Sequence, residues 1–126
     1  MWFGKAIVGL AVLGTLASFV YGGATAADSK NHYNVRDLGI STCAKYMQDR
    51  SLKKDTSGYA NWMMGFITAY NWLKPDTFEI APELGNKTKL LVYLDLWCGK
   101  APKKTLNDAT VELVGVLYAK RQKVGK

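Results

Sequence analysis

The chain has very little of the chemistry that enzymes and metal sites use. Its 126 residues include one histidine, His32, and two cysteines, Cys43 and Cys98. A structural zinc site takes four such ligands, so this set is too small to build one. The sequence also lacks the glycine-rich loops that bind nucleotides and the G-x-S-x-G turn of serine hydrolases. These absences predict a protein with no catalytic residues, no bound metal and no cofactor.

The first 27 residues have the pattern of a secretory signal peptide. Lys5 is their only charged residue, an apolar stretch follows at 6–21, and residues 24–26 (Ala-Thr-Ala) form a small-x-small cleavage motif. We therefore expect cleavage after residue 26 or 27 and export to the periplasm, with no membrane contact afterwards. The alternative is an uncleaved anchor, because residues 6–27 are long enough to cross a bilayer.

The two cysteines predict a single disulfide. An exported chain enters an oxidising compartment, and an even number of cysteines allows complete pairing. A Cys43–Cys98 bridge would enclose 54 residues, and a loop of this size stabilises a fold by about 4 kcal/mol in the chain-entropy model. Free thiols or an intermolecular link are the alternatives. Pairing would leave no thiol for catalysis.

Basic residues outnumber acidic ones by 17 to 10. Removal of the signal takes away only Lys5, so the formal net charge falls from +7 to +6. The basic residues are scattered, with small groups at Lys53-Lys54, Lys103-Lys104 and 120–126, and no nucleic-acid-binding module accompanies them. We expect a solvated basic surface and no nucleic-acid partner.

Four amphipathic stretches predict a small all-α domain over residues 41–120, after a flexible leader at 28–40 and before a basic tail at 121–126. The expected helices cover residues 41–50, 57–74 and 86–98 and a fourth segment from 105 onward. Residues suited to begin or end these helices stand at their limits: Ser41 or Thr42, Asn86 and Thr105 at the starts, and Pro75 and Gly99 at the ends. A strand over 87–96 is the alternative to the third helix.

The third expected helix is apolar on nearly every side. Val92 and Leu96 lie outside its main stripe, so we expect this helix to be central and buried. Asp95 is its one acidic residue. This carboxylate lies either at an exposed edge or partly buried, where its pKa would rise or a lysine would pair with it. An enzyme would need Asp95 beside a second carboxylate in a cleft.

Other residues carry more local expectations. Gly58, Gly65 and Ala69 form a flank of the second helix that a neighbouring helix could approach closely. Val116 belongs to the inward face expected for the fourth helix. Phe78 and Ile80 are expected to hold the connector at 76–85 against the core. Met64 and Trp72 lie off the apolar stripe of the second helix, so they either form an exposed protein-binding patch or, for Trp72, fold under that connector.

Several of these features together resemble the HdeA/HdeB family of periplasmic acid-stress chaperones. They are Thr42-Cys43 with Tyr46 three residues later, Trp62-Met63-Met64 in a long helix, and Trp97-Cys98 four residues before Pro102. Ala101 departs from the pattern, which has Asn before the proline. The aromatic stretch at 59–71 is longer than in those chaperones, and it is also similar to small periplasmic immunity proteins of type VI secretion systems.

The resemblance implies a small disulfide-bonded helical protein that exposes apolar surface at low pH and binds unfolding client proteins, as a monomer or a homodimer. The side chains that we expect to bind other proteins are Trp62, Met63, Met64, Phe66, Trp72 and Trp97. An immunity protein would instead use a preformed surface to bind one toxin at neutral pH.

Overall fold

The computed structural model describes residues 27–124, and the statements about structure that follow concern those residues. The signal peptide and the alternative of a membrane anchor therefore lie outside the described residues, except for Ala27. The compact part of the chain begins at Asn34. It is built from four α-helices: α1 (Cys43–Ser51), α2 (Ser57–Leu73), α3 (Lys87–Lys100) and α4 (Leu106–Leu117). The all-α class with one disulfide is confirmed.

Three single-turn 3-10 helices complete the described part of the chain. They are η1 (Asp37–Ile40), η2 (Pro82–Leu84) and η3 (Tyr118–Lys120). Residues 27–124 contain no β-strand and only two isolated β-bridges, Thr42 to Thr105 and Glu79 to Gln122. The strand alternative for 87–96 is therefore wrong, because α3 covers it.

The helices begin where the sequence predicts, because local side-chain caps satisfy their first backbone N–H groups. The side-chain oxygens of Thr42 and Asn86 each accept the backbone N–H three residues later, at 3.2 and 2.9 Å. Thr105 and Asp108 exchange two such bonds, which is a capping box. At the other end of α2, Pro75 prevents the helix from continuing past Leu73.

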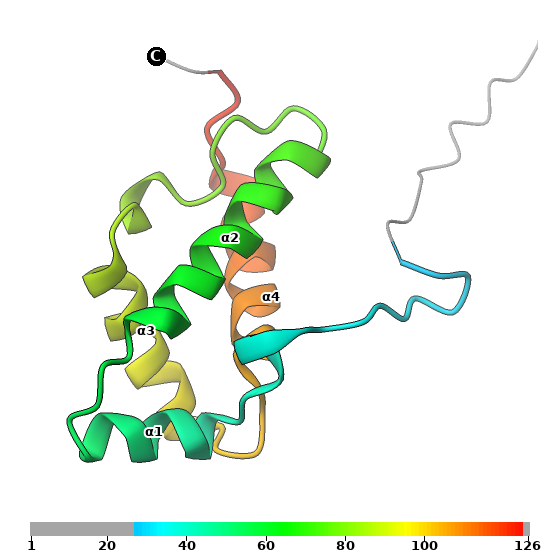
Figure 1. Cartoon of the computed structure of the whole chain (residues 1–126). Helices are drawn as coiled ribbons and strands as arrows, with labels where there is room; N and C mark the ends of the chain where they lie inside the picture. The colour runs from blue at the N-terminus through cyan, green and yellow to red at the C-terminus, as the bar shows by residue number, and fades with distance from the viewer. Residues whose placement is uncertain (1–26, 125–126) are drawn as a thin grey trace, which may run out of the picture. The chain divides into compact units, whose positions relative to one another are not determined.

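The hydrophobic core lies where α2 meets the other helices. Figure 1 shows α2 running obliquely across the domain, with α3 and α4 beside it and α1 crossing at one end. The fully buried apolar side chains come from all four helices: Tyr46 of α1, Met63 of α2, Leu90 and Leu94 of α3, and Ala109 and Val114 of α4. Ala60 of α2 is also fully buried.

The expectation that α3 is the buried central helix is wrong. Its Leu90, Leu94 and Cys98 face the core, whereas Val92 and Leu96 are 54% and 68% exposed. α3 packs against α1, α2 and α4 with one side only, and the other side is open to solvent. Val116 of α4, expected to face inward, is also exposed.

The close contact expected at the small residues of α2 occurs only at Gly58, where a Cβ would lie 3.1 Å from the Leu38 side chain of η1. A Cβ atom placed on Gly65 would have no neighbour within 4 Å, and Ala69 is exposed. A closer approach is at Gly39 of η1, where a Cβ would lie 2.2 Å from the ring of Trp62. The packed domain therefore starts before Ser41, inside the segment expected to be a flexible leader.

The basic tail is also partly ordered. The backbones of Gln122 and Glu79 exchange hydrogen bonds at 2.8 and 3.1 Å, and the guanidinium of Arg121 lies 4.1 Å from the centre of the Tyr118 ring. These contacts hold the segment after α4 against the connector that follows α2. The first two residues of the basic tail, Arg121 and Gln122, therefore belong to the packed domain.

Candidate functional site

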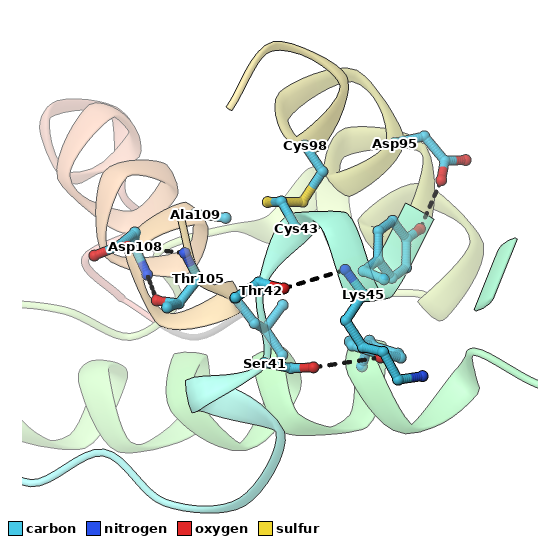
Figure 2. The surroundings of a disulfide bond; sticks show 12 residues. Ser41, Thr42, Cys43, Lys45, Asp95, Cys98, Thr105, Asp108 and Ala109 are labelled. Atoms are coloured by element: carbon cyan, nitrogen blue, oxygen red, sulfur yellow. Dashed lines mark hydrogen bonds between the residues drawn. A yellow bond between two sulfur atoms is a disulfide. The ribbon is translucent and has the colours of Figure 1, made fainter. Parts of the chain in front are cut away.

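The disulfide joins the first residue of α1 to the last turn of α3. Cys43 and Cys98 are both buried, and their Cα atoms are 4.9 Å apart. Figure 2 shows the bridge between α1 and α3, with the capped start of α4 nearby. The predicted pairing is confirmed, and the alternatives of free thiols or an intermolecular link are wrong.

Backbone hydrogen bonds reinforce this junction. The N–H groups of Cys43 and Ala44 donate to the carbonyls of Lys104 and Pro102 at 2.8 and 2.9 Å, and Leu106 donates to Ser41 at 2.9 Å. The start of α1 and the turn between α3 and α4 are thus tied together by one covalent bond and three hydrogen bonds.

Asp95 is the acceptor of a charged cluster between α1 and α3. The Tyr46 hydroxyl donates to its Oδ1 at 2.6 Å (Figure 2), and Arg50 donates from Nε to Oδ1 at 2.9 Å and from its terminal nitrogen to Oδ2 at 2.5 Å. Partial burial would raise the pKa of Asp95, but the hydrogen bonds from Arg50 and Tyr46 outweigh it and lower that pKa. The expected raised pKa is therefore wrong, and the cationic partner is an arginine rather than a lysine.

Asp49 is the acceptor of a second cluster, between α1 and α2. It is 7% exposed, and its Oδ1 pairs with Lys45 at 2.5 Å and with Lys54 at 3.3 Å. The hydroxyl of Tyr59 donates to Oδ2 at 2.8 Å. The bonds from Lys45 and Tyr59 lower the pKa of Asp49 to about 2. The carboxylate therefore stays ionised down to strongly acidic pH.

Asp49 was not among the predicted site residues. The spacing of four residues between Lys45 and Asp49 is a weak signal for an ion pair on a helix surface. The decisive donor is Tyr59, which belongs to a different helix, so only the tertiary structure reveals that the carboxylate is buried.

The two clusters meet through a pair of tyrosine rings. The rings of Tyr46 and Tyr59 contact edge to face, with their centres 4.9 Å apart. Through these contacts α1 is attached to α2 by Asp49 and to α3 by Asp95. We call the five side chains of these contacts, Tyr46, Asp49, Arg50, Tyr59 and Asp95, the α1 network. Protonation of its carboxylates would weaken the attachment of α1 on both sides, while the disulfide would remain.

Five of the six side chains assigned to protein binding are not freely available in the folded state. Met63 is completely buried, and Trp62, Met64, Phe66 and Trp97 are half-buried against the core. The Trp62 indole also donates to the carbonyl of Arg36 at 3.1 Å. Only Trp72 is exposed, at 84%. The native fold therefore does not bring the six together as one surface.

Trp72 does not fold under the connector, so that alternative is wrong. The preceding residue, Asn71, holds the connector instead: its amide oxygen accepts the N–H of Ile80 at 2.8 Å, and its nitrogen donates to Glu79 at 3.1 Å. Ile80 is buried as expected, whereas Phe78 is 56% exposed. Successive residues of a helix point about 100° apart, so anchoring by Asn71 leaves Trp72 facing solvent.

The described residues show neither a candidate metal site nor a helix that could span a membrane. Residues 27–124 contain no group of three or more histidine, cysteine, aspartate or glutamate side chains that could hold a metal ion. His32 is exposed and lies 3.8 Å from Asp28. In the same range, no helix is long and apolar enough to cross a membrane.

Comparison with models of protein families, with curated proteins and with solved structures gave no match for this chain.

Proposed function

We propose that this chain is a non-enzymatic, exported protein-binding protein that captures unfolding clients at low pH, in the manner of the HdeA/HdeB family that it resembles. The observation that carries the proposal is the α1 network. Two ionised carboxylates, Asp49 and Asp95, attach one helix to the rest of a small disulfide-bonded domain.

Acid acts on this network in one direction. A carboxylate whose native pKa is lowered stabilises the fold at pH values above its unfolded pKa, near 3.9, and the contribution is lost as the pH falls through the native pKa. For Asp49 this loss takes place between about pH 4 and pH 2. Asp95 adds a loss of the same sign. The contacts of α1 are thus present at neutral pH and fail in strong acid.

Acid also changes the charge of the whole chain. Once the signal with Lys5 is removed, neutralising the ten acidic residues raises the formal net charge from +6 to about +16. Self-repulsion at this charge favours an expanded chain and opposes aggregation of the protein with itself. The disulfide limits the expansion, because Cys43 stays joined to Cys98 when the rest of α1 moves.

The client surface in this proposal is the side of α2 and α3 that α1 covers. Release of α1 uncovers the ring of Tyr59, which Tyr46 contacts in the folded state. Further loosening makes the half-buried Trp62, Phe66 and Trp97 accessible. Side chains that the folded protein keeps from solvent would then bind apolar segments of clients.

The test is suppression of client aggregation, followed by light scattering as a function of pH. We expect the wild-type chain to suppress aggregation of an acid-denatured enzyme at pH 2–3 and not at pH 7. A variant carrying Asp49→Asn and Asp95→Asn mimics the protonated network, so its suppression should begin at a higher pH. The matched control carries Glu83→Gln and Glu112→Gln, which are exposed and outside the α1 network, and its pH profile should follow the wild type.

No suppression by the wild type at pH 2–3 would contradict the proposal. If the wild type, the variant and the control all suppress aggregation with the same pH profile, the chaperone role is supported. That result would contradict the role of the α1 network as the acid-sensitive trigger.

A second candidate function, immunity towards a toxin of a type VI secretion system, is favoured by the exposure of Trp72. This indole is 84% exposed in the folded state, and Leu73 and Phe78 are 59% and 56% exposed. An exposed indole such as that of Trp72 would bind one partner at neutral pH without unfolding. A pull-down from a periplasmic extract at pH 7 and at pH 3 separates the two functions. A single partner at pH 7 that is no longer captured by the Trp72→Ala variant supports immunity. Many partners, captured only at pH 3, support the chaperone function.

A further inference from the structure

The solvent side of α3 carries two apolar residues between two lysines. Lys89, Val92, Leu96 and Lys100 follow one another at spacings of three and four residues, which places them on one face of the helix. Val92 and Leu96 are 54% and 68% exposed, and both lysines are exposed. Figure 1 shows α3 along one side of the domain. The stripe is roughly 16 Å long at 1.5 Å per residue, about the length of three helical turns.

Two further lysines follow in the chain shortly after the end of α3. Lys103 and Lys104 are exposed in the turn that follows, where the N–H of Lys104 donates to the carbonyl of Ala101 at 3.0 Å. The carbonyls of Lys104 and Pro102 accept hydrogen bonds from the start of α1, and the disulfide lies immediately before the turn. The lysines therefore extend from a backbone that is held in place.

These positive charges have no acidic partner in the described part of the chain. Lys100, Lys103 and Lys104 form no ion pair among residues 27–124, and Lys89 donates only to a backbone carbonyl, that of Glu83. The single acidic residue of α3, Asp95, is already paired with Arg50. The stripe is thus apolar at its centre and positively charged at both ends.

We call the following six residues the α3 face: Lys89, Val92, Leu96, Lys100, Lys103 and Lys104. We propose that the α3 face binds an acidic amphipathic helix of another protein at neutral pH. The apolar side of that helix would cover Val92 and Leu96, and its carboxylates would pair with the lysines at the two ends. A second copy of this chain fits poorly, because its own lysines would meet the same lysines. The interaction uses the folded state, so it is separate from the capture of clients in acid.

The test uses two synthetic helical peptides of about 18 residues, a length that covers the α3 face with a turn to spare at each end. Both have leucine at spacings of three and four residues, and their flanking positions are all glutamate in one peptide and all lysine in the other. Binding is measured by fluorescence anisotropy at pH 7 in low and in moderate salt. We expect the acidic peptide to bind at least about tenfold more tightly than the basic one, and to weaken as salt rises.

Two variants locate the binding. Reversal of three charges, with Lys100→Glu, Lys103→Glu and Lys104→Glu, should weaken binding of the acidic peptide by roughly tenfold or more. Leu96→Asp should weaken binding of the acidic peptide by a similar factor, because the substitution removes the apolar centre and adds a negative charge that repels the carboxylates of the peptide. All four residues are exposed, so circular dichroism and the urea midpoint should show that the variants stay folded.

The matched control has the same net charge as the triple variant, but its three substitutions lie at other positions in the chain. Lys30→Glu, Lys74→Glu and Lys120→Glu change exposed lysines outside the α3 face, and this control should bind the acidic peptide within about twofold of the wild type.

Three outcomes overturn the proposal. The first is equal binding of both peptides, or equal weakening in the triple variant and its control. The second is binding to phosphatidylglycerol vesicles with none to the acidic peptide, which would assign the α3 face to a lipid surface. The third is a dimer in sedimentation equilibrium that Leu96→Asp dissociates, which would assign this face to a second copy. This proposal rests on different residues from the chaperone proposal. If the chain gives no protection to clients in acid, the α3 face is still expected to bind the acidic peptide at pH 7, so either proposal can be refuted without the other.

Discussion

The bond from Tyr46 to Asp95 makes a sharp test of the α1 network, because both residues can be changed with little change of shape. Tyr46→Phe removes only the hydroxyl and keeps the ring, which contacts Tyr59 in the core. Asp95→Asn keeps an acceptor for the hydroxyl but removes the charge that Arg50 also uses. The two single variants and the double variant form a double-mutant cycle.

The expected size follows from the geometry of this bond. The Tyr46 side chain is 1% exposed and its hydroxyl lies 2.6 Å from Oδ1 of Asp95. A hydrogen bond to a charged group contributes about 1.5 to 3 kcal/mol, and one between neutral groups about 0.5 to 1.5 kcal/mol. Asp95 keeps 32% of its side-chain surface exposed, which favours the lower end. We expect Tyr46→Phe to cost about 1.5 kcal/mol at pH 7, with a coupling to Asp95→Asn of about 1 kcal/mol.

The pH dependence distinguishes this bond from ordinary packing. The pKa of Asp95 is lowered in the folded state, so the carboxylate is charged at pH 7 and becomes neutral as the pH falls through that pKa. Urea unfolding, with the midpoint and slope measured for all four proteins at pH 7 and at the lowest pH at which all four still unfold in one cooperative transition, should show a smaller coupling at the lower pH. A coupling below about 0.3 kcal/mol at pH 7, or one that grows towards acid, would refute the role assigned to the charge.

The remaining predictions concern stability and can be read from thermal or urea unfolding. Met63→Ala should destabilise the fold by about 3 kcal/mol, because this side chain is completely buried; a loss under about 1 kcal/mol would contradict its place in the core. Gly39→Ala should destabilise the fold by about 2 kcal/mol, because the new methyl group would press against the ring of Trp62 and so also shift its fluorescence. The control is Gly65→Ala, where a methyl group has open space. This variant should be neutral or stabilising by up to about 1 kcal/mol. Thr105→Ala should cost about 1 kcal/mol through loss of the capping box, and an unchanged urea midpoint would count against it. Reduction of the disulfide should lower the free energy of unfolding by about 4 kcal/mol in the chain-entropy model, measured with and without a thiol reductant; no effect of the reductant on the midpoint would contradict this.

The starts of the helices could be predicted because the signals that set them are local, whereas the end expected at Gly99 is wrong, because α3 continues through Gly99 to Lys100. Thr42, Asn86 and Thr105 accept bonds from backbone groups three residues away, so each cap can be recognised within a four-residue window. Pro75 acts on the residue directly before it. The apolar repeat of α2 likewise identifies Tyr59, Met63 and Ile67, which are buried, but it also includes Leu73, which is 59% exposed.

The candidate site could be predicted only in part, because its contacts join helices that are distant in the sequence. Asp95 was recognised as unusual within an apolar helix, but its partners Tyr46 and Arg50 are more than 40 residues away. Trp72 was recognised as off the main stripe of its helix. Its exposure depends on Asn71, which binds the connector on the adjacent side of the helix.

The sequence by itself determined that this chain forms four helices and that its two cysteines pair, since helix periodicity and capping are local and two cysteines allow only one bridge within a chain. Only the tertiary structure decided which sides of those helices are buried. α3 is apolar almost all round, and only its packing against α1, α2 and α4 shows that Val92 and Leu96 are left in solvent. The same packing surrounds Asp49 and Asp95 with donors from neighbouring helices, and these donors lower both pKa values. A pKa depends on the groups around a carboxylate in space, and that arrangement arises only when the helices assemble.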